Sequence, residues 1–454
     1  MLLKFSVKNF AAIGETQHLN LTTGKARGKT GHLLKAGSQR ALKFSSIYGA
    51  NAAGKSTMIR AMHFGKNMIQ IGSLDKRFLS INRSADTWKE QPTEFTYTLF
   101  LNKKLYEYGF SLSWQDETIL REWLVEKNSK LEPKTIFIRD FVAEQFELNI
   151  AAKNSDVVKR LNVYFEDASN EENLLFLHEI NSQKGNLFDI DPSFQYLKTI
   201  YRWFLTKLKF VYPNGSDLGS YSFLNYPDNH DKLYRYLSDL DIPISKMSQV
   251  EVTIEQAFWD VPTAIVKEIE AGLKNLYQQQ ESKDGNPISL TMRIQDNYYI
   301  IEANAEGFLN IKTISFTHGK FGTYEFNEES DGTKRILELL EIITSPEQDV
   351  TYVVDEIDRS LHPLLTEKLI SMYLDSETPN RNQLIITTHE SRLLNLRKLR
   401  KDEIYFALNS NGQSQFIRLD EYEQDNTRTD LNIELAYLSG RYGGIPTLIK
   451  CEDI

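Results

Sequence analysis

The sequence predicts an α/β fold in which two parts of one sheet-and-helix core are separated by a mostly helical insertion. An apolar run at 46–48 leads into a glycine-containing loop and then into a helical pattern beginning near Lys55. Residues 326–420 alternate helical patterns with short apolar runs, which is typical of a largely parallel sheet buried under helices. Between these parts, residues 150–285 are helical in pattern and rich in charge.

The remaining segments have the pattern of strands. Residues 1–60 show two strand patterns, a loop and a third strand before the helix at Lys55. Residues 93–125 alternate apolar and polar side chains, as in an antiparallel meander, and strand patterns return at 288–314. We therefore divide the chain into an N-terminal part, a mostly helical insertion and a C-terminal part: residues 1–150, 151–285 and 286–454.

The composition is that of an ordinary soluble protein, with 41% hydrophobic and 25% charged residues. No run approaches the roughly 18 to 20 apolar residues of a membrane span, so no membrane partner is expected. Cys451 is the only cysteine, which rules out an internal disulfide bond and gives no sign of an oxidising compartment. We expect a cytoplasmic protein.

The formal net charge of −9 disfavours nucleic acid as the only partner, because proteins that neutralise phosphates are usually basic. Two local basic stretches remain. Each fits either solvated surface, the commoner case, or a nucleic-acid contact. They comprise Lys25, Arg27 and Lys29 near the start, and Arg392, Arg397, Lys398, Arg400 and Lys401 near the end.

The segment from Gly49 to Thr57 matches the phosphate-loop pattern G-x-x-x-x-G-K-[ST], and it stands between a strand pattern and a helix pattern, as that motif requires. Loop N–H groups and the positive end of the helix would face phosphate oxygens, and Lys55 would reach the β- and γ-phosphates of ATP. The Ser56 hydroxyl would join the Mg²⁺ shell. The alternative is an ordinary strand-to-helix turn. The predicted nucleotide contacts are Asn51, Ala52, Ala53, Gly54, Lys55, Ser56 and Thr57.

Two acids follow the apolar run 350–354. Ligands of parallel α/β sheets bind at the carboxyl ends of strands, so Asp355 is a candidate Mg²⁺ ligand and Glu356 a candidate catalytic residue that polarises the attacking water. Two acids at a strand end are otherwise usually surface residues. Their interpretation depends on the phosphate loop.

The apolar run 383–387 is followed by Thr388 and His389. A single histidine is more often a structural hydrogen-bonding residue than a catalytic one. Its place after the strand that follows the acidic pair favours a second catalytic assignment, in which His389 contacts the γ-phosphate.

With these residues in view, the chain resembles the ABC-type ATPase heads of SMC, RecF and Rad50 proteins and of the OLD family. It is similar in more detail to bacterial AAA-family ATPases of abortive infection and phage defence, of the AbiLi kind. The segments that carry this resemblance are 8–10, 355–363, 387–390 and 437–446. It implies an ABC/SMC-like P-loop head, a mixed sheet with an antiparallel β subdomain, that uses ATP and Mg²⁺.

The resemblance also implies where a second subunit would contribute. Ser330 and Gly332 occupy the place of the ABC signature, which contacts the γ-phosphate held by the other subunit, although the usual Leu-Ser-Gly-Gly run is absent. Taken alone, Ser-Asp-Gly-Thr fits a turn. Asp358 would belong to the loop that crosses the dimer interface. The glutamine loop is expected within residues 80–98, and the glycine-rich segment 440–444 receives no role.

Three functions follow from these patterns. The first is a sensor or scaffold ATPase of a phage-defence system, working as a dimer or larger assembly that responds to a phage protein and controls a separately encoded effector, as in PARIS-type pairs. No nuclease activity is expected, because the roughly 65 residues after His389 hold no acidic metal cluster. The second is a RecF- or Rad50-like repair ATPase, disfavoured by the acidic charge and the lack of a long coiled coil. The third is the nucleotide-binding subunit of a transporter, disfavoured by the insertion.

Overall fold

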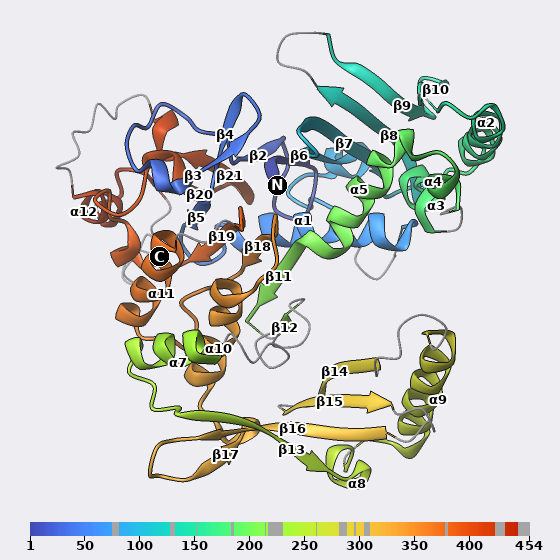
Figure 1. Cartoon of the computed structure of the whole chain (residues 1–454). Helices are drawn as coiled ribbons and strands as arrows, with labels where there is room; N and C mark the ends of the chain where they lie inside the picture. The colour runs from blue at the N-terminus through green and yellow to red at the C-terminus, as the bar shows by residue number, and fades with distance from the viewer. Residues whose placement is uncertain are drawn as a thin grey trace. The chain divides into compact units, whose positions relative to one another are not determined.

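The structure is a computed structural model (Figure 1). It divides into two compact units, which are described separately: residues 1–216, 347–359 and 374–454 form the first, and residues 217–346 and 360–373 form the second. The residues that it describes are 1–74, 81–127, 132–150, 152–182, 186–213, 215–216, 230–259, 261–280, 288–294, 297–303, 309–376, 380–422 and 432–443.

An antiparallel sheet of seven strands forms one part of the first unit. Its strand β6 alternates buried and outward residues. Phe95, Tyr97 and Leu99 are buried while the residues between them are not, which is why this stretch pairs as a meander. In sheet order the strands are β10 (Gln145–Leu148), β9 (Lys134–Asp140), β8 (Thr118–Lys127), β7 (Lys104–Ser113), β6 (Thr93–Leu101), β1 (Leu2–Lys8) and β2 (Gln17–Asn20).

The second sheet of this unit is the core sheet. Its five middle strands run parallel, and an antiparallel strand closes each edge. In order the strands are β12 (Gly215–Ser216), β11 (Leu208–Tyr212), β18 (Thr351–Val354), β19 (Gln383–Thr388), β5 (Phe44–Tyr48), β20 (Ile404–Ser410) and β21 (Gln413–Arg418). A separate hairpin joins β3 (Leu33–Ala36) to β4 (Gln39–Leu42). The expectation of an α/β fold with a mixed sheet and an antiparallel subdomain is confirmed.

Helix α1 (Lys55–Ile71) packs against both sheets. On one side the Tyr97 hydroxyl of β6 donates to the Met62 carbonyl at 2.9 Å. On the other the His63 ring stacks on Phe210 of β11, with centroids 4.4 Å apart. Burial of both helix faces fixes α1 between the sheets. The other helices of this unit are α2 (Ser155–Ser169), α3 (Phe176–Ser182), α4 (Leu187–Ile190), α5 (Tyr196–Arg202) and α12 (Ile433–Leu438).

The second unit is built on its own sheet. Its strands are β13 (Lys246–Val252), β16 (Leu309–Thr317), β15 (Asn297–Ala303) and β14 (Ile288–Ile294), and β17 (Thr323–Glu325) pairs with β16. The helices that lie in it are α7 (His230–Asp239), α8 (Ile254–Ala257), α9 (Thr263–Gln280), α10 (Asp331–Thr344) and most of α11 (Pro363–Asp375). Among the described residues, no helix is long and apolar enough to cross a membrane.

The described residues of the segment 151–285, expected to be mostly helical, include the strands β11, β12 and β13. β11 pairs in parallel with β18, which lies about 140 residues later in the chain, so this five-residue run is part of the core sheet. β13 lies in the sheet of the second unit. A short apolar run is too short for its hydrophobic periodicity to distinguish a strand from a helix. Its structure is determined by pairing with a strand that is distant in sequence. The compact units therefore divide at other positions than residues 150 and 285.

A buried ion pair joins the antiparallel sheet to α3. Glu122 of β8 and Arg139 of β9 lie 2.7 Å apart and both side chains are fully buried. The Glu122 carboxylate also accepts the Tyr108 hydroxyl at 2.9 Å and the backbone N–H of Phe176 at 2.8 Å. Because every polar partner is inside the fold, removal of one charge leaves the other without compensation.

Substitution of Glu122 by glutamine should therefore lower the free energy of unfolding by about 3 to 5 kcal/mol, as for a buried charge that loses its partner. The matched control is Glu126→Gln on the same strand, whose partner Lys104 is half exposed. That change should cost less than about 1 kcal/mol. Urea unfolding of both variants measures the difference, and equal losses would contradict the importance of the buried pair.

Candidate functional site

The phosphate-loop residues follow β5, an inner strand of the core sheet. β5 is buried along its whole length between β19 and β20, and the chain leaves it at Gly49 and enters α1 at Lys55. Between them the backbone takes left-handed conformations at Ala52 (φ 61°) and Gly54 (φ 97°). An added Cβ at Gly54 would meet the Ser414 hydroxyl at 2.0 Å, so this position requires glycine for both space and conformation.

The N-terminus of α1 has no side-chain cap, because its N-cap residue is Gly54. The first N–H groups of any helix lack an intrahelical acceptor, so the amides at this end point into the loop with the positive end of the helix dipole behind them. Ala53 and Thr57 are buried, whereas Asn51 and Ala52 are exposed. The Ala52 carbonyl accepts the Asn409 amide at 3.3 Å, which attaches the loop to β20.

The Lys55 side chain lies across this loop. Its Nζ donates to the Gly49 carbonyl at 2.8 Å and the Ala50 carbonyl at 3.0 Å, and it lies 3.3 Å from Nδ1 of His389. Burial lowers the pKa of Lys55 to about 8, although nearby carboxylates, Asp355 first, act to raise it. The ammonium is thus held at the loop by two carbonyls and the His389 ring, and an anion there would favour its charged form.

The two acids stand where β18 ends. Asp355 is buried, and its Oδ1 accepts the Ser56 hydroxyl at 3.1 Å and the Thr387 hydroxyl at 2.5 Å. The backbone N–H of Glu356 donates to the same Thr387 oxygen at 2.8 Å, and Glu356 has a left-handed backbone with φ of 49°. Such strain in a non-glycine residue persists only where the surroundings impose it, and it clusters at functional sites.

His389 follows β19 and is exposed. Its backbone N–H lies 3.4 Å from both carboxylate oxygens of Asp358, and its ring faces Lys55. Burial, and then the charge of Lys55, lowers the pKa of His389. A neutral ring with an unprotonated Nδ1 can accept from the lysine. The structure therefore brings six predicted residues together where the parallel strands of the core sheet end. They are Lys55, Ser56, Asp355, Glu356, Asp358 and His389.

Ser330 and Gly332 belong to the second unit. The Ser330 hydroxyl accepts the Thr333 N–H at 3.1 Å and so caps α10, which accounts for a serine at this position without any ligand. Gly332 lies against the chain, because an added Cβ would stand 3.0 Å from the Ser360 carbonyl. The Ser-Asp-Gly-Thr segment, which the sequence also allowed to be a turn, thus forms the N-terminal cap of α10.

Thr387 was absent from the predicted site, although it links Asp355 to the backbone of Glu356. Its signal was weak, namely a hydroxyl among the apolar residues of β19 two positions before His389. Ser414, which crowds Gly54, gave no signal at all because β21 is distant in sequence. Of the glycine-rich segment near the C-terminus, Gly440 and Gly443 have left-handed backbones, whereas Gly444 lies outside the described residues, as does Cys451.

The oxygen atoms of Ser56, Asp355 and Thr387 are hard donors of the kind that Mg²⁺ prefers. Among the described residues, no group of three or more His, Cys, Asp or Glu side chains is placed to hold a metal ion by itself. One carboxylate and two hydroxyls fit Mg²⁺ only together with further oxygen ligands, as when phosphates and water complete its octahedron.

The solved structures that are similar to this chain include two SMC heads. The crystal structure of an SMC head bound to the C-winged helix domain of ScpA is 13% identical, with a TM-score of 0.40 over 92% of this chain and 97% of that chain. The SMC head domain from Thermotoga maritima is 10% identical, with a TM-score of 0.33 over 92% and 98%. No curated protein matches. The family model described as "AAA domain, putative AbiEii toxin, Type IV TA system" matches residues 44–395, more than half of the chain.

Proposed function

Because this chain belongs to the family of AAA domains described as putative AbiEii toxins of type IV toxin–antitoxin systems, we propose that it binds and hydrolyses ATP in the service of an abortive-infection defence. The observation that carries the ATPase part is the convergence of Lys55, Ser56, Asp355, Glu356 and His389 at one sheet edge. These residues come from three segments spread over more than 330 positions, so their meeting is a property of the fold.

The loop from Asn51 to Thr57 would hold the phosphates. The uncapped N-terminus of α1 offers amide donors and a positive dipole, which is the common anion site of helices. Lys55 would exchange its two carbonyl acceptors for phosphate oxygens. Ser56 and Asp355 would hold Mg²⁺, which when bound neutralises charge that develops on the phosphates.

Glu356 is proposed as the residue that positions the attacking water. Water adds to the γ-phosphorus, its proton passes to the Glu356 carboxylate, and the bond to the bridging oxygen breaks to release ADP and phosphate. The left-handed backbone and the bond to Thr387 would fix where this side chain starts. His389, held through its backbone by Asp358, would contact the γ-phosphate.

We propose that two subunits complete each site. Ser330 and Gly332 at the N-terminus of α10 would contact the γ-phosphate bound by the other subunit, and Asp358 would lie at the interface. A helix N-terminus with a capping serine and a glycine suits an anion.

The defence role rests on the description of the family, which names a putative toxin of a type IV system. We propose that this chain acts as sensor and scaffold, triggered by a phage protein, and that a separately encoded protein is the toxic effector.

Lys55→Ala should abolish ATP binding, because the loop loses its cation. Glu356→Gln should retain binding and accumulate an ATP-bound dimer, since only the water-activating group is removed. Equilibrium binding of labelled ATP, phosphate release and size-exclusion chromatography with light scattering measure the three quantities. Turnover by Glu356→Gln at the rate of the unmodified protein would show that the catalytic assignment is wrong.

Mixing two inactive variants tests the composite site. Ser330→Asp keeps a good helix cap but places a carboxylate against the γ-phosphate of the other subunit. Mixed with Lys55→Ala, it should recover about a quarter of the activity, because half of the dimers then hold one intact site of two. The control mixture of Lys55→Ala with Glu356→Gln damages both sites and should recover nothing. Equal recovery in both mixtures, or none in either, contradicts a site shared in this way.

The defence role predicts a dependence on both phage and neighbouring genes. Expressed alone in a bacterial host, the chain should leave growth unchanged, whereas with its genomic neighbours it should reduce phage yield at least about tenfold, a loss that Lys55→Ala should abolish. Growth curves and plaque counts measure both. Growth arrest by the chain alone would make it the toxin itself, contrary to the scaffold role, and protection that survives Lys55→Ala would separate defence from ATP.

A further inference from the structure

One long stretch of the chain contains no acidic residue. From Thr16 to Leu74 there is neither aspartate nor glutamate, although the whole chain carries a formal charge of −9. The basic residues of this stretch are Lys25, Lys29, Lys35, Lys43, Lys55, Lys66, Arg27, Arg40 and Arg60. Lys55 belongs to the proposed ATP site, whereas those before residue 41 lie on a loop and the β3–β4 hairpin.

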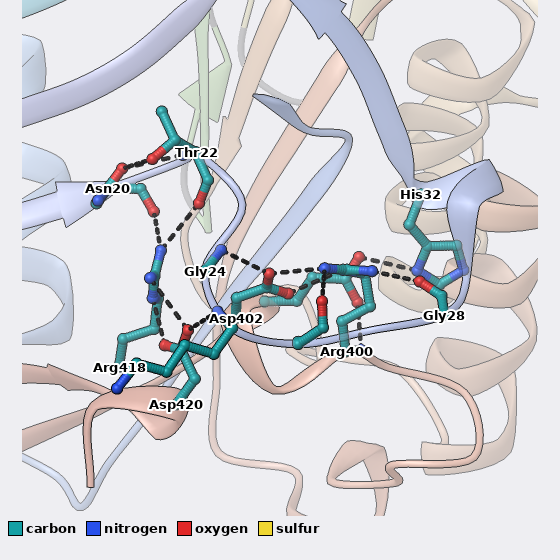
Figure 2. A network of polar contacts seen from close by, with 12 residues as sticks. Asn20, Thr22, Gly24, Gly28, His32, Arg400, Asp402, Arg418 and Asp420 are labelled. Atoms are coloured by element: carbon teal, nitrogen blue, oxygen red, sulfur yellow. Dashed lines mark hydrogen bonds and ion pairs between the residues drawn. The ribbon is translucent and has the colours of Figure 1, made fainter. Parts of the chain in front are cut away.

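Side chains from near the C-terminus hold this loop in place (Figure 2). Arg400 donates to the carbonyls of Ala26, at 2.8 Å, and Gly28. Arg418 donates to the Thr22 carbonyl at 3.0 Å. The contact also runs in the other direction, because Lys29 donates to the Leu396 carbonyl at 2.9 Å. The two basic stretches of the sequence, more than 360 residues apart, therefore lie side by side.

Three carboxylates of this region are held inside the fold, whereas Glu421, 3.8 Å from Arg418, is exposed. Asp402 binds Arg400 through both oxygens, at 2.8 and 2.7 Å, and accepts the Gly24 N–H at 2.9 Å. Asp420 binds Arg418 at 2.6 Å, and Glu403 lies 2.8 Å from the His32 ring. These three carboxylate side chains are at most 5% exposed. They cannot reach cations on the surface.

Five of the cations in these segments lie on the outside, next to the contacts just described. The side chains of Lys25, Arg27, Lys35, Arg40 and Arg397 are exposed, and none makes a hydrogen bond or ion pair with a residue that the structure describes. Lys35 and Arg40 are even direct partners across the β3–β4 hairpin, an arrangement of like charges that destabilises a sheet unless an anion lies between them.

The five cations lie on neighbouring segments, which short contacts connect. Lys25 and Arg27 flank Ala26, which Arg400 holds. Arg397 follows the carbonyl that Lys29 binds. The hairpin is attached next to the loop through the Thr23 N–H, which donates to the Arg40 carbonyl at 3.1 Å. We call these five residues the basic surface.

The basic surface contains no apolar anchor. Among the described residues, the large apolar side chains that are exposed all lie outside 16–44 and 391–422. Protein interfaces depend on buried aromatic or aliphatic anchors, and membrane surfaces bind helices with an apolar face. Binding to the phosphates of nucleic acid needs neither, because it is driven by release of counterions. An open Gly28, whose Cβ position meets nothing within 4 Å, allows close approach of a backbone.

We propose that the basic surface binds the phosphate backbone of a nucleic-acid duplex without reading its sequence. This inference does not rest on the proposed ATPase function, because none of the five residues belongs to the ATP site. Five phosphate contacts imply that the logarithm of the affinity falls with the logarithm of salt concentration with a slope of about −4 to −5.

The test compares two variants of equal charge in the full-length chain. Lys25→Ala/Arg27→Ala removes two members of the basic surface, and Lys134→Ala/Lys153→Ala removes two exposed lysines elsewhere in the same unit. Fluorescence anisotropy with DNA duplexes of two unrelated sequences is measured between 50 and 200 mM salt, values at which such binding changes strongly. Thermal melting verifies that both variants are folded.

The unmodified protein and the control should bind both duplexes with the same slope. The Lys25→Ala/Arg27→Ala variant should bind both more weakly, with a slope shallower by about 2. Absence of DNA binding at 50 mM salt, or equal losses in the two folded variants, would overturn the proposal. A third result would also overturn it: the protein binds phosphatidylserine vesicles through Lys25 and Arg27 but does not bind DNA. The basic surface would then be a membrane-binding surface.

Discussion

The parallel pairing of β5 with β19 on one side and β20 on the other is the constraint on which the candidate site depends. In a parallel sheet the carboxyl ends of all strands lie on the same side, so the residues that follow neighbouring strands lie close together. The phosphate loop follows β5, the acids follow β18, and His389 follows β19. Tyr48 stands opposite Thr388, and Val354 opposite Ile386, so β5 and β19 end at the same level and β18 ends two residues earlier. Sheet register thus determines the distances of the site.

The site residues could be predicted from the sequence where they belong to a short local motif. Gly54, Lys55 and Ser56 form a spaced motif, and the acids and His389 end strongly apolar runs. Thr387 could not be recognised, since its importance arises only from a contact with Asp355 across two strands. Ser330, by contrast, belongs to a local sequence motif, but its role as a helix cap already explains the serine. Its proposed contact with phosphate is a matter for experiment.

The fold was predictable for the antiparallel meander and for the alternating C-terminal region, where periodicity extends over many residues. It was not predictable at β11, because five residues between helical segments carry too little pattern and the partner β18 decides the structure. Nor did composition indicate how charge is distributed. A chain of net charge −9 still presents unpaired cations where its carboxylates are turned inward. Net charge describes solubility and average fields, whereas recognition depends on which charges reach the surface.

The position of β5 has a consequence for how the chain is made. Its two neighbours, β19 and β20, are synthesised about 340 residues after it, as the pairing of Phe44 with Leu384 shows. At ribosomal speeds of about 5 to 20 residues per second, this strand waits roughly 20 to 70 seconds for its partners. The antiparallel sheet from β6 to β10 needs only local hairpins and can form during that time. α1 can pack on this sheet through Met62 and Tyr97. During synthesis, β5 can therefore be shielded from solvent only by the antiparallel sheet and α1 until β19 and β20 pair with it.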